Sequence, residues 1–348
     1  MEGRCTISNL YSIQPALSAD IETSRITRLP ILLLNAHTQC NCRCVMCDIW
    51  KRKDGREFRA VDLERHRDSI VTLGVKHVVL TGGEPLLNKE LEAICEFFRN
   101  LGLRLTLLTT GLLLQKKADA VAVGFDDIIV SIDGPRDVHN LIRRVPDAFQ
   151  AIQKGVAAIR ACRPGMPISC RTTVQKANRT HLRATVSSAK ALGLDSISFL
   201  AADVSSTAFN REMIWDEERR SEIALSQAEM IELDEEIELL IEMHREDIKN
   251  GFIVENNAKL RKIASHFRAN IEGKPLKAPI CNAPWVSAVV EVDGSVRPCF
   301  FHPPIGNAHQ MTLAEALNTE TALSFRNRLN VATDPTCQRC VCSLNYSG

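Results

Sequence analysis

Short apolar runs alternate with longer amphipathic stretches between residue 31 and about residue 200. Apolar positions recur at helical spacing in the stretches 61–73, 88–101, 115–123, 146–162 and 180–192. The apolar runs that separate these stretches cover 31–35, 78–81, 103–109, 127–133, 168–174 and 196–200. Strands that alternate with helices in this way predict repeated βαβ units and a parallel sheet. Six such units form either an open sheet or a partial barrel, and both place the chemistry at the carboxyl ends of the strands.

The pattern becomes helical after residue 200. Ser226 and Glu229 have the spacing of a capping box, and apolar residues then recur at helical spacing as far as Asn250 and Gly251. A second helix is expected near 256–272. These helices predict a linker region that differs from the alternating pattern before it.

The carboxyl-terminal part predicts a hairpin followed by a helix near 312–329. Asp293 and Gly294, a strong two-residue turn signal, separate the apolar runs 288–292 and 295–299. We therefore predict an α/β protein that contains a partial (β/α)6 TIM-like barrel. Its expected divisions are an amino-terminal segment 1–30, the barrel 31–215, a helical linker 216–280 and a small hairpin-plus-helix domain 281–348.

Composition and charge exclude several classes of protein. The chain has 348 residues, of which 45% are apolar and 24% charged, as in an ordinary folded protein. Its 43 basic and 42 acidic residues give a net charge of +1, which offers no electrostatic drive toward nucleic acid or an anionic membrane. The sequence has no apolar run of 18 residues or more. We expect a cytoplasmic protein with no membrane or nucleic-acid partner.

Cysteine is unusually frequent, with 13 residues, and two groups are tightly spaced. In a reducing compartment such groups indicate metal or iron–sulfur ligands before disulfides. Cys40, Cys44 and Cys47 form a C-x3-C-x2-C pattern, and Cys42 is left over. Three thiolates on one loop can hold three irons of a cubane cluster and leave the fourth iron open to a small molecule. A structural zinc site, completed by Cys42 or His37, is the alternative.

A second motif lies 35 residues after Cys47, where the next predicted strand ends in Gly82, Gly83, Glu84 and Pro85. Together, the two motifs resemble those of the radical S-adenosylmethionine (SAM) superfamily. The resemblance implies that a 4Fe–4S cluster binds SAM and reduces it. SAM is then cleaved to methionine and a 5′-deoxyadenosyl radical, which removes a hydrogen atom from the substrate.

The resemblance also implies which residues contact SAM. The Gly82, Gly83, Glu84 and Pro85 motif would receive its amino group, and the polar pair of Ser131 and Asp133 would lie near its ribose and carboxylate. The candidates for the methionyl carboxylate are Arg143, Arg144 and Arg171. Met46 stands where many family members have an aromatic residue near adenine, and it cannot stack in the same way.

The second group of cysteines follows the predicted hairpin. Cys281 and Cys299 flank the hairpin, and Cys337, Cys340 and Cys342 lie near the end of the chain. This arrangement resembles the SPASM/twitch extension of radical SAM enzymes, in its shorter form with one auxiliary 4Fe–4S cluster. The resemblance assigns Cys281, Cys299, Cys337 and Cys340 as ligands and leaves Cys342 as a spare thiol or an alternative ligand. A structural zinc ribbon remains the alternative.

These features predict an oxidoreductase or a related radical-chemistry enzyme that acts on a small molecule, by dehydrogenation or rearrangement. The short amino-terminal segment and the single auxiliary cluster favour a small molecule over a peptide. The alternatives are a maturase of a ribosomally made peptide or protein and a non-catalytic zinc-binding module. By the same resemblance, the reductant is a flavodoxin or ferredoxin. No catalytic acid or base is assigned.

Overall fold

The structure is a computed structural model that describes residues 24–347 apart from 212 and 275. Its internal contacts divide the chain into two units. The first unit holds the described parts of Met1–Thr38, Arg56–Leu105 and Lys277–Gly348, and the second holds Gln39–Gly55 and Thr106–Leu276. The boundaries predicted at 30, 215 and 280 rest on changes in the sequence pattern and not on contacts, and they stay predictions.

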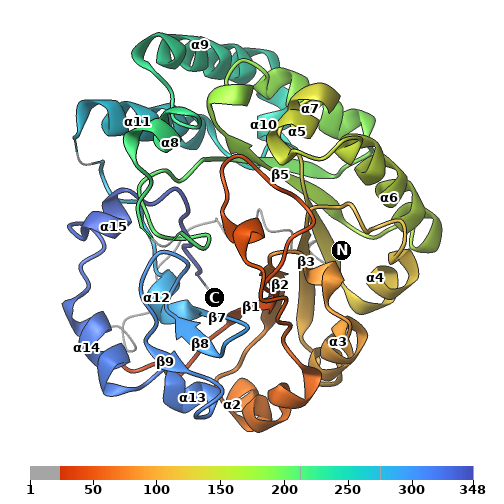
Figure 1. Cartoon of the computed structure of the whole chain (residues 1–348), viewed down its shortest axis with the longest axis vertical. Helices are drawn as coiled ribbons and strands as arrows, with labels where there is room; N and C mark the ends of the chain where they lie inside the picture. Colours follow the sequence, from red (N-terminus) through yellow and green to blue (C-terminus); the bar gives the residue numbers. More distant parts are fainter. Residues whose placement is uncertain (1–23, 212, 275, 348) are drawn as a thin grey trace. The chain divides into compact units, whose positions relative to one another are not determined.

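The first unit is built around β1, which pairs in parallel with both β2 and β7. The strands run in the order β2-β1-β7-β8-β9, and the last two are added antiparallel. These strands are β1 (Ile31–His37), β2 (His77–Gly82), β7 (Ser287–Val290), β8 (Ser295–Arg297) and β9 (Gly306–Asn307). The helices of this unit are η3 (Ala60–His66), α2 (Arg67–Thr72), η4 (Pro85–Leu87), α3 (Leu91–Asn100), α12 (Ala283–Val286), α13 (Leu313–Ala316), α14 (Glu320–Arg328) and α15 (Pro335–Gln338) (Figure 1).

The second unit contains parallel strands in the order β6-β5-β4-β3. They are β3 (Arg104–Thr109), which enters this unit at Thr106, β4 (Asp127–Ser131), β5 (Ile168–Val174) and β6 (Ser196–Ala201). The helices are η2 (Ile49–Lys51), α4 (Ala118–Gly124), α5 (Arg136–Arg143), α6 (Ala148–Cys162), η5 (Lys176–Asn178), α7 (Leu182–Ala191), α8 (Glu217–Ser221), α9 (Gln227–Met243), α10 (Arg245–Lys249) and α11 (Asn257–Glu272).

The six predicted strands correspond to β1–β6, so the α/β prediction is confirmed. Strands β5 and β6 illustrate the pattern that predicts a strand, because buried and half-buried residues alternate along both. Cys170, Thr172 and Phe199 on one face are buried, whereas Arg171 and Ser198 on the other are half-buried. A strand with this period of two buries one face and leaves the other face for polar side chains.

Two predicted helices are divided in the structure. The helix expected after Ser226 begins there with the predicted capping box, but α9 ends at Met243, and α10 starts at Arg245 after the shared cap residue His244. The helix expected near 312–329 is divided into α13 and α14, because Thr319 accepts a hydrogen bond from the Ala322 N–H at 3.1 Å and begins a new helix.

The predicted hairpin is present, but its loop is longer than expected. Glu291 and Ser295 still pair across the hairpin, so three residues form the loop in place of two. Gly294 takes a left-handed conformation with φ of 81°. This geometry is typical of a three-residue hairpin loop that ends in glycine. In the described part of the chain, no helix combines the length and the apolar character that crossing a membrane requires.

Candidate metal and cofactor sites

The cysteine loop of the second unit brings four thiols together. Cys42 is buried and hydrogen-bonds with the sulfurs of Cys40 and Cys44, which raises its own pKa well above the ordinary range. Burial raises the pKa of Cys47 to about 12, and the nearby Cys44 and Cys40 sulfurs raise it too. The three predicted ligands therefore lie close to one another around Cys42, and a donor set of this kind fits an iron–sulfur cluster.

Helix α5 holds this loop from one side. The N–H groups of Arg43 and Val45 donate to the carbonyls of Arg143 and Ile142, at 3.1 and 3.0 Å. The Arg143 guanidinium also donates to the Cys44 sulfur at 3.6 Å. The hydrogen bond from Cys42, together with the Arg143 charge, lowers the pKa of Cys44 to about 7 despite its burial. Cys44 is thereby prepared to act as a thiolate at neutral pH.

Asp133 fixes Arg143 in this position. Its carboxylate lies 2.6 Å from the Arg143 Nε, and both side chains are buried. The other carboxylate oxygen accepts from the Thr173 N–H at 2.9 Å, and the Asp133 N–H donates to His139 Nδ1 at 3.1 Å. Asp133 therefore pairs with Arg143, and Arg143 in turn contacts the cysteine loop. Their predicted direct contacts with SAM stay predictions, and Arg144 is exposed.

A polar row crosses β4, β5 and β6. The strand register aligns Ser131 with Arg171 and Arg171 with Ser198. The Arg171 Nε donates to the Ser198 hydroxyl at 3.3 Å. All three side chains are half-buried, so Ser131 and Arg171 lie where a ligand can reach them. Their predicted roles as SAM contacts stay predictions.

The glycine-rich motif of the first unit ends β2. Gly82 has a φ of 121°, and a Cβ there would lie 2.8 Å from the His37 carbonyl, so only glycine fits. The Gly83 N–H donates to the same carbonyl at 2.8 Å. The Glu84 carboxylate is fully buried and accepts from the Leu86 N–H at 3.0 Å, next to Pro85 at the start of η4. The motif therefore has one fixed conformation at the carboxyl end of its strand.

Sequence reasoning missed the amides that brace these turns. Asn88 is buried and donates to the Ala36 and Phe58 carbonyls, both at 2.8 Å. Asn178 is buried as well and donates to the carbonyls of Asp133 and Thr173, at 2.8 and 3.0 Å. A lone asparagine carries no spacing signal, so these partners were not predictable from the sequence.

The carboxyl-terminal cysteines meet through contacts between distant segments. The Asn282 N–H donates to the Leu344 carbonyl at 2.8 Å, and its side chain pairs with the Tyr346 backbone at 2.7 and 2.9 Å. These bonds tie the residue after Cys281 to the residues that follow Cys342. No described cysteine forms a disulfide.

These carboxyl-terminal thiols are enclosed and perturb one another. Burial raises the pKa of Cys299 to about 11, and Cys281 and Cys342 raise it too. Burial likewise raises the pKa of Cys337 to about 12 and the pKa of Cys340 still further. Backbone N–H groups of Phe301 and His302 hydrogen-bond to the Cys299 sulfur. Clustered thiols, of which Cys299 accepts backbone hydrogen bonds, fit an iron–sulfur cluster, whose metal charge would stabilise the thiolates.

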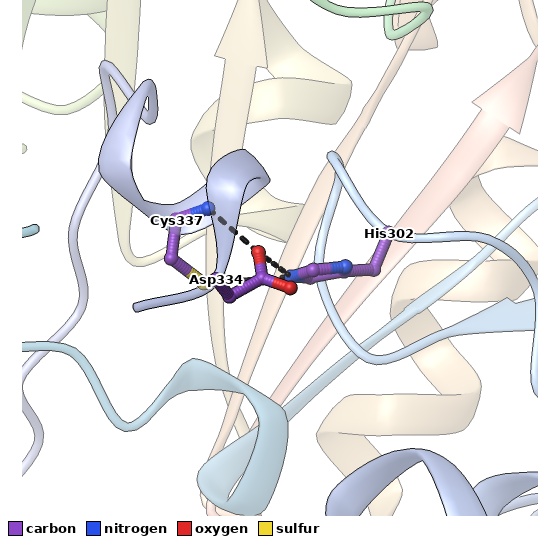
Figure 2. A group of neighbouring side chains, drawn as sticks. All are labelled: His302, Asp334 and Cys337. Carbon is purple, nitrogen blue, oxygen red and sulfur yellow. Dashed lines mark hydrogen bonds and ion pairs between the residues drawn. The ribbon is translucent and has the colours of Figure 1, made fainter. Parts of the chain in front are cut away.

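His302 and Asp334 adjoin one of these ligands (Figure 2). The His302 Nε2 lies 3.5 Å from the Cys337 sulfur and 3.8 Å from an Asp334 oxygen. Asp334 also caps α15 by accepting from the Cys337 N–H at 2.9 Å. His302 is buried, and its ring packs edge-on against Phe325 with the centroids 4.9 Å apart. The pattern of spaced cysteines gave no sign of this histidine.

Comparison with known proteins finds one family model over each of the two cysteine-containing regions. The model of the radical SAM superfamily matches residues 34–175, and the model of an iron–sulfur cluster-binding domain, SPASM, matches residues 281–341. The AdoMet-dependent heme synthase of Methanosarcina barkeri is 30% identical over 44% of this chain and 45% of its own length. The pre-heme d1 synthase of Dinoroseobacter shibae is 31% identical over 46% of this chain. The match spans 40% of that synthase, so this chain spans less than half the length of both relatives.

Other similarities extend over nearly the whole chain. The cysteine-type anaerobic sulfatase-maturating enzyme of Clostridium perfringens is 23% identical over 90% of this chain and 86% of its own length. A solved structure titled native anSMEcpe with bound AdoMet and Cp18Cys peptide has a similar fold, with a TM-score of 0.62 and 19% identity. The match covers 92% of this chain and 93% of that one. This chain therefore contains a radical SAM domain over residues 34–175 and a SPASM iron–sulfur cluster-binding domain over residues 281–341.

Proposed function

We propose that this chain is an enzyme that uses a 4Fe–4S cluster held by Cys40, Cys44 and Cys47 to cleave SAM and remove a hydrogen atom from a substrate. The observation that carries the proposal is the cysteine loop itself, where three spaced thiols converge and Arg143 faces Cys44. When bound, the cluster supplies the electron that cleaves SAM into methionine and a 5′-deoxyadenosyl radical.

The chain's own residues prepare this chemistry. Arg143 places a positive charge beside Cys44 and is itself held by the buried Asp133 carboxylate. The buried Cys42 thiol donates to Cys44 and is not one of the proposed ligands. Gly82 and Glu84 hold the strand-end motif that is proposed to receive the SAM amino group.

The auxiliary cluster is proposed on Cys281, Cys299, Cys337 and Cys340. Cys342 is exposed, unlike the half-buried four, which supports its role as a spare thiol. Its proximity to Cys299 keeps it available as an alternative ligand. The four half-buried thiols would brace the domain and hold the second cluster.

The direct test is SAM cleavage under anaerobic conditions with dithionite as the electron source. We expect wild-type protein to release 5′-deoxyadenosine and the Cys40→Ala variant to release none. Cys162→Ala is the matched control, because Cys162 is an exposed thiol on α6 outside both groups. Full cleavage by the Cys40→Ala variant would contradict the proposed ligand set.

A small-molecule substrate remains the first candidate, as the sequence predicts. The second candidate is a peptide, which the similarity to the sulfatase-maturating enzyme over 90% of this chain supports. Incubation with SAM and either a polyol and aminosugar panel or cysteine-containing peptides separates the two. The correct class should raise 5′-deoxyadenosine formation above the rate without substrate and yield a product that is changed in mass. A flavodoxin or ferredoxin reductant and a cytoplasmic location remain part of this proposal.

A further inference from the structure

The segment that follows β6 returns to the cysteine loop and binds its carbonyl groups. The Arg219 guanidinium donates to the carbonyl of Val45. The Arg211 Nη2 donates to the carbonyl of Met46 at 3.4 Å, and the Asn210 amide donates to the carbonyl of Asp48 at 3.1 Å. Three side chains of one segment therefore hold three carbonyls within four residues of the loop.

Arg211 lies at the centre of these contacts. Its side chain is 1% exposed and forms an ion pair at 2.7 Å with Asp203, which is 2% exposed. It also donates to the carbonyls of Asp203 and Ser206, at 2.8 and 3.1 Å. A buried ion pair of this kind contributes little net stability, but it specifies one arrangement of the groups around it.

Trp215 forms a second connection between Arg211 and the loop, because it contacts both. Its ring lies under the Arg211 guanidinium, 3.8 Å from centroid to guanidinium carbon, and Arg219 covers it at 4.8 Å. Its indole N–H donates to the Asp48 carboxylate at 2.7 Å. Asp48 directly follows Cys47, so the ring fixes the chain next to the third predicted ligand.

The backbone of this segment is strained where it reaches the loop. Phe209 and Asn210 both have positive φ values, 60° and 65°. Bulky residues rarely adopt this left-handed conformation, and such strain persists only where surrounding contacts enforce it. The strained turn brings Asn210 and Arg211 to the carbonyls of Asp48 and Met46, on either side of Cys47.

The loop itself has little structure of its own. In the described chain its only regular element is η2, which starts after Asp48. The N–H groups of Arg43 and Val45 are bound by the end of α5, and the carbonyls of 45, 46 and 48 are bound by the segment after β6. Within the loop, the Lys51 N–H also donates to the Asp48 carbonyl at 3.0 Å. The other four groups are bound by neighbouring segments, so the conformation of the loop depends on both supports.

We propose that Asp203, Asn210, Arg211, Trp215 and Arg219 form a clamp that holds residues 45–48 in the conformation that binds the cluster and SAM. This inference rests on the proposed function. Arg211 acts as a positioning residue, because it touches the loop through the Met46 carbonyl. Met46 stands at the position predicted to lie near adenine, so the clamp should affect SAM binding as well as cluster retention.

The test is hydrogen exchange of the reconstituted full chain, compared with the electron paramagnetic resonance signal of its reduced cluster with and without SAM. Arg211→Met should speed exchange in peptides covering 43–48 by about tenfold or more, because it removes several buried hydrogen bonds. It should also weaken or abolish the change that SAM causes in the cluster signal. Arg261→Met is the matched control, since it breaks the exposed Arg261–Glu238 pair and should change neither readout.

A subtler variant guards against simple unfolding. Trp215→Phe keeps an aromatic ring under Arg211 and removes only the donor to Asp48, so faster exchange should be confined to the loop. If Arg211→Met speeds exchange throughout the chain, the variant is unfolded in general, and Trp215→Phe becomes the variant that tests the clamp. Unchanged exchange at 43–48 and an unchanged response to SAM in the deciding variant would overturn the clamp. A wild-type protein with no SAM-sensitive cluster would instead overturn the proposed function.

Discussion

The two groups of cysteines reach the same kind of site by different routes. The first group lies on one loop, so a few residues of chain bring its sulfurs together, and the neighbouring segments set their exact arrangement. The second group runs from Cys281 to Cys342 and meets only because the chain on either side is tied together, as Asn282 is to Tyr346. The first site should therefore depend on supports around one loop, and the second on folding of its whole domain.

The electrostatic surroundings also differ. In the first group the Cys42 hydrogen bond and the Arg143 charge lower the pKa of Cys44 to about 7. In the second group burial, followed by Asp334 and neighbouring thiols, raises the pKa of Cys337 to about 12. One thiolate of the first group is prepared by the protein, whereas the thiolates of Cys299, Cys337 and Cys340 need the charge of the metal.

Removing Arg143 should have the largest effect on the first group. Arg143→Met leaves the buried Asp133 carboxylate unpaired, and breaking such a pair costs roughly 3–5 kcal/mol of folding free energy. Denaturant unfolding measures this loss. Arg261→Met is the control, because its pair with Glu238 is exposed and should contribute little to the free energy of folding. Equal losses in the two variants would contradict the special role of Arg143.

Asn282 offers the matching test of the second group. Asn282→Ala removes two hydrogen bonds to Tyr346, a loss of about 1–3 kcal/mol at roughly 0.5–1.5 kcal/mol each. We expect this variant to lose auxiliary iron while SAM cleavage continues. Iron analysis beside 5′-deoxyadenosine formation measures both. Loss of SAM cleavage with full iron content would show that the two groups do not behave independently.

A pH titration of the cluster-free protein should sharpen the contrast with the smallest perturbation. Because its folded pKa is lowered to about 7, Cys44 should become a thiolate as the pH rises through 7. Cys299 and Cys337, with pKa values raised to about 11 and about 12, should stay protonated up to pH 9. Thiolate absorbance between pH 6 and 9 should therefore show a step that Cys44→Ala removes. A step that persists in this variant would assign it to another thiol.

The sequence predicted features that depend on local pattern. Apolar runs located the six strands, and the short spacing of Cys40, Cys44 and Cys47 was sufficient to group them. Helix α5 was missed because its eight residues are mostly polar or charged and offer few apolar positions. This helix nevertheless supplies Arg143 and the carbonyls that hold the cysteine loop.

Partners that are distant in sequence could not be predicted. Arg211 and Trp215 have no spacing relative to Cys47 that would distinguish them from any surface residue, and only the fold brings them to the loop. The sequence predicts Arg143 as a SAM ligand, but it gives no sign of the ion pair between Arg143 and the buried Asp133 carboxylate. The buried pair could be recognised only once β4 and α5 were placed.

The most direct test of this account is the iron and sulfide content per chain after anaerobic reconstitution, measured with zinc. The wild-type protein should contain about eight irons, and the Cys40/Cys44/Cys47 triple-Ala variant about four, because each 4Fe–4S cluster contributes four. That result would place one cluster at each group of cysteines. Unchanged iron in the triple variant, or a wild-type protein that binds zinc and no iron, would contradict it.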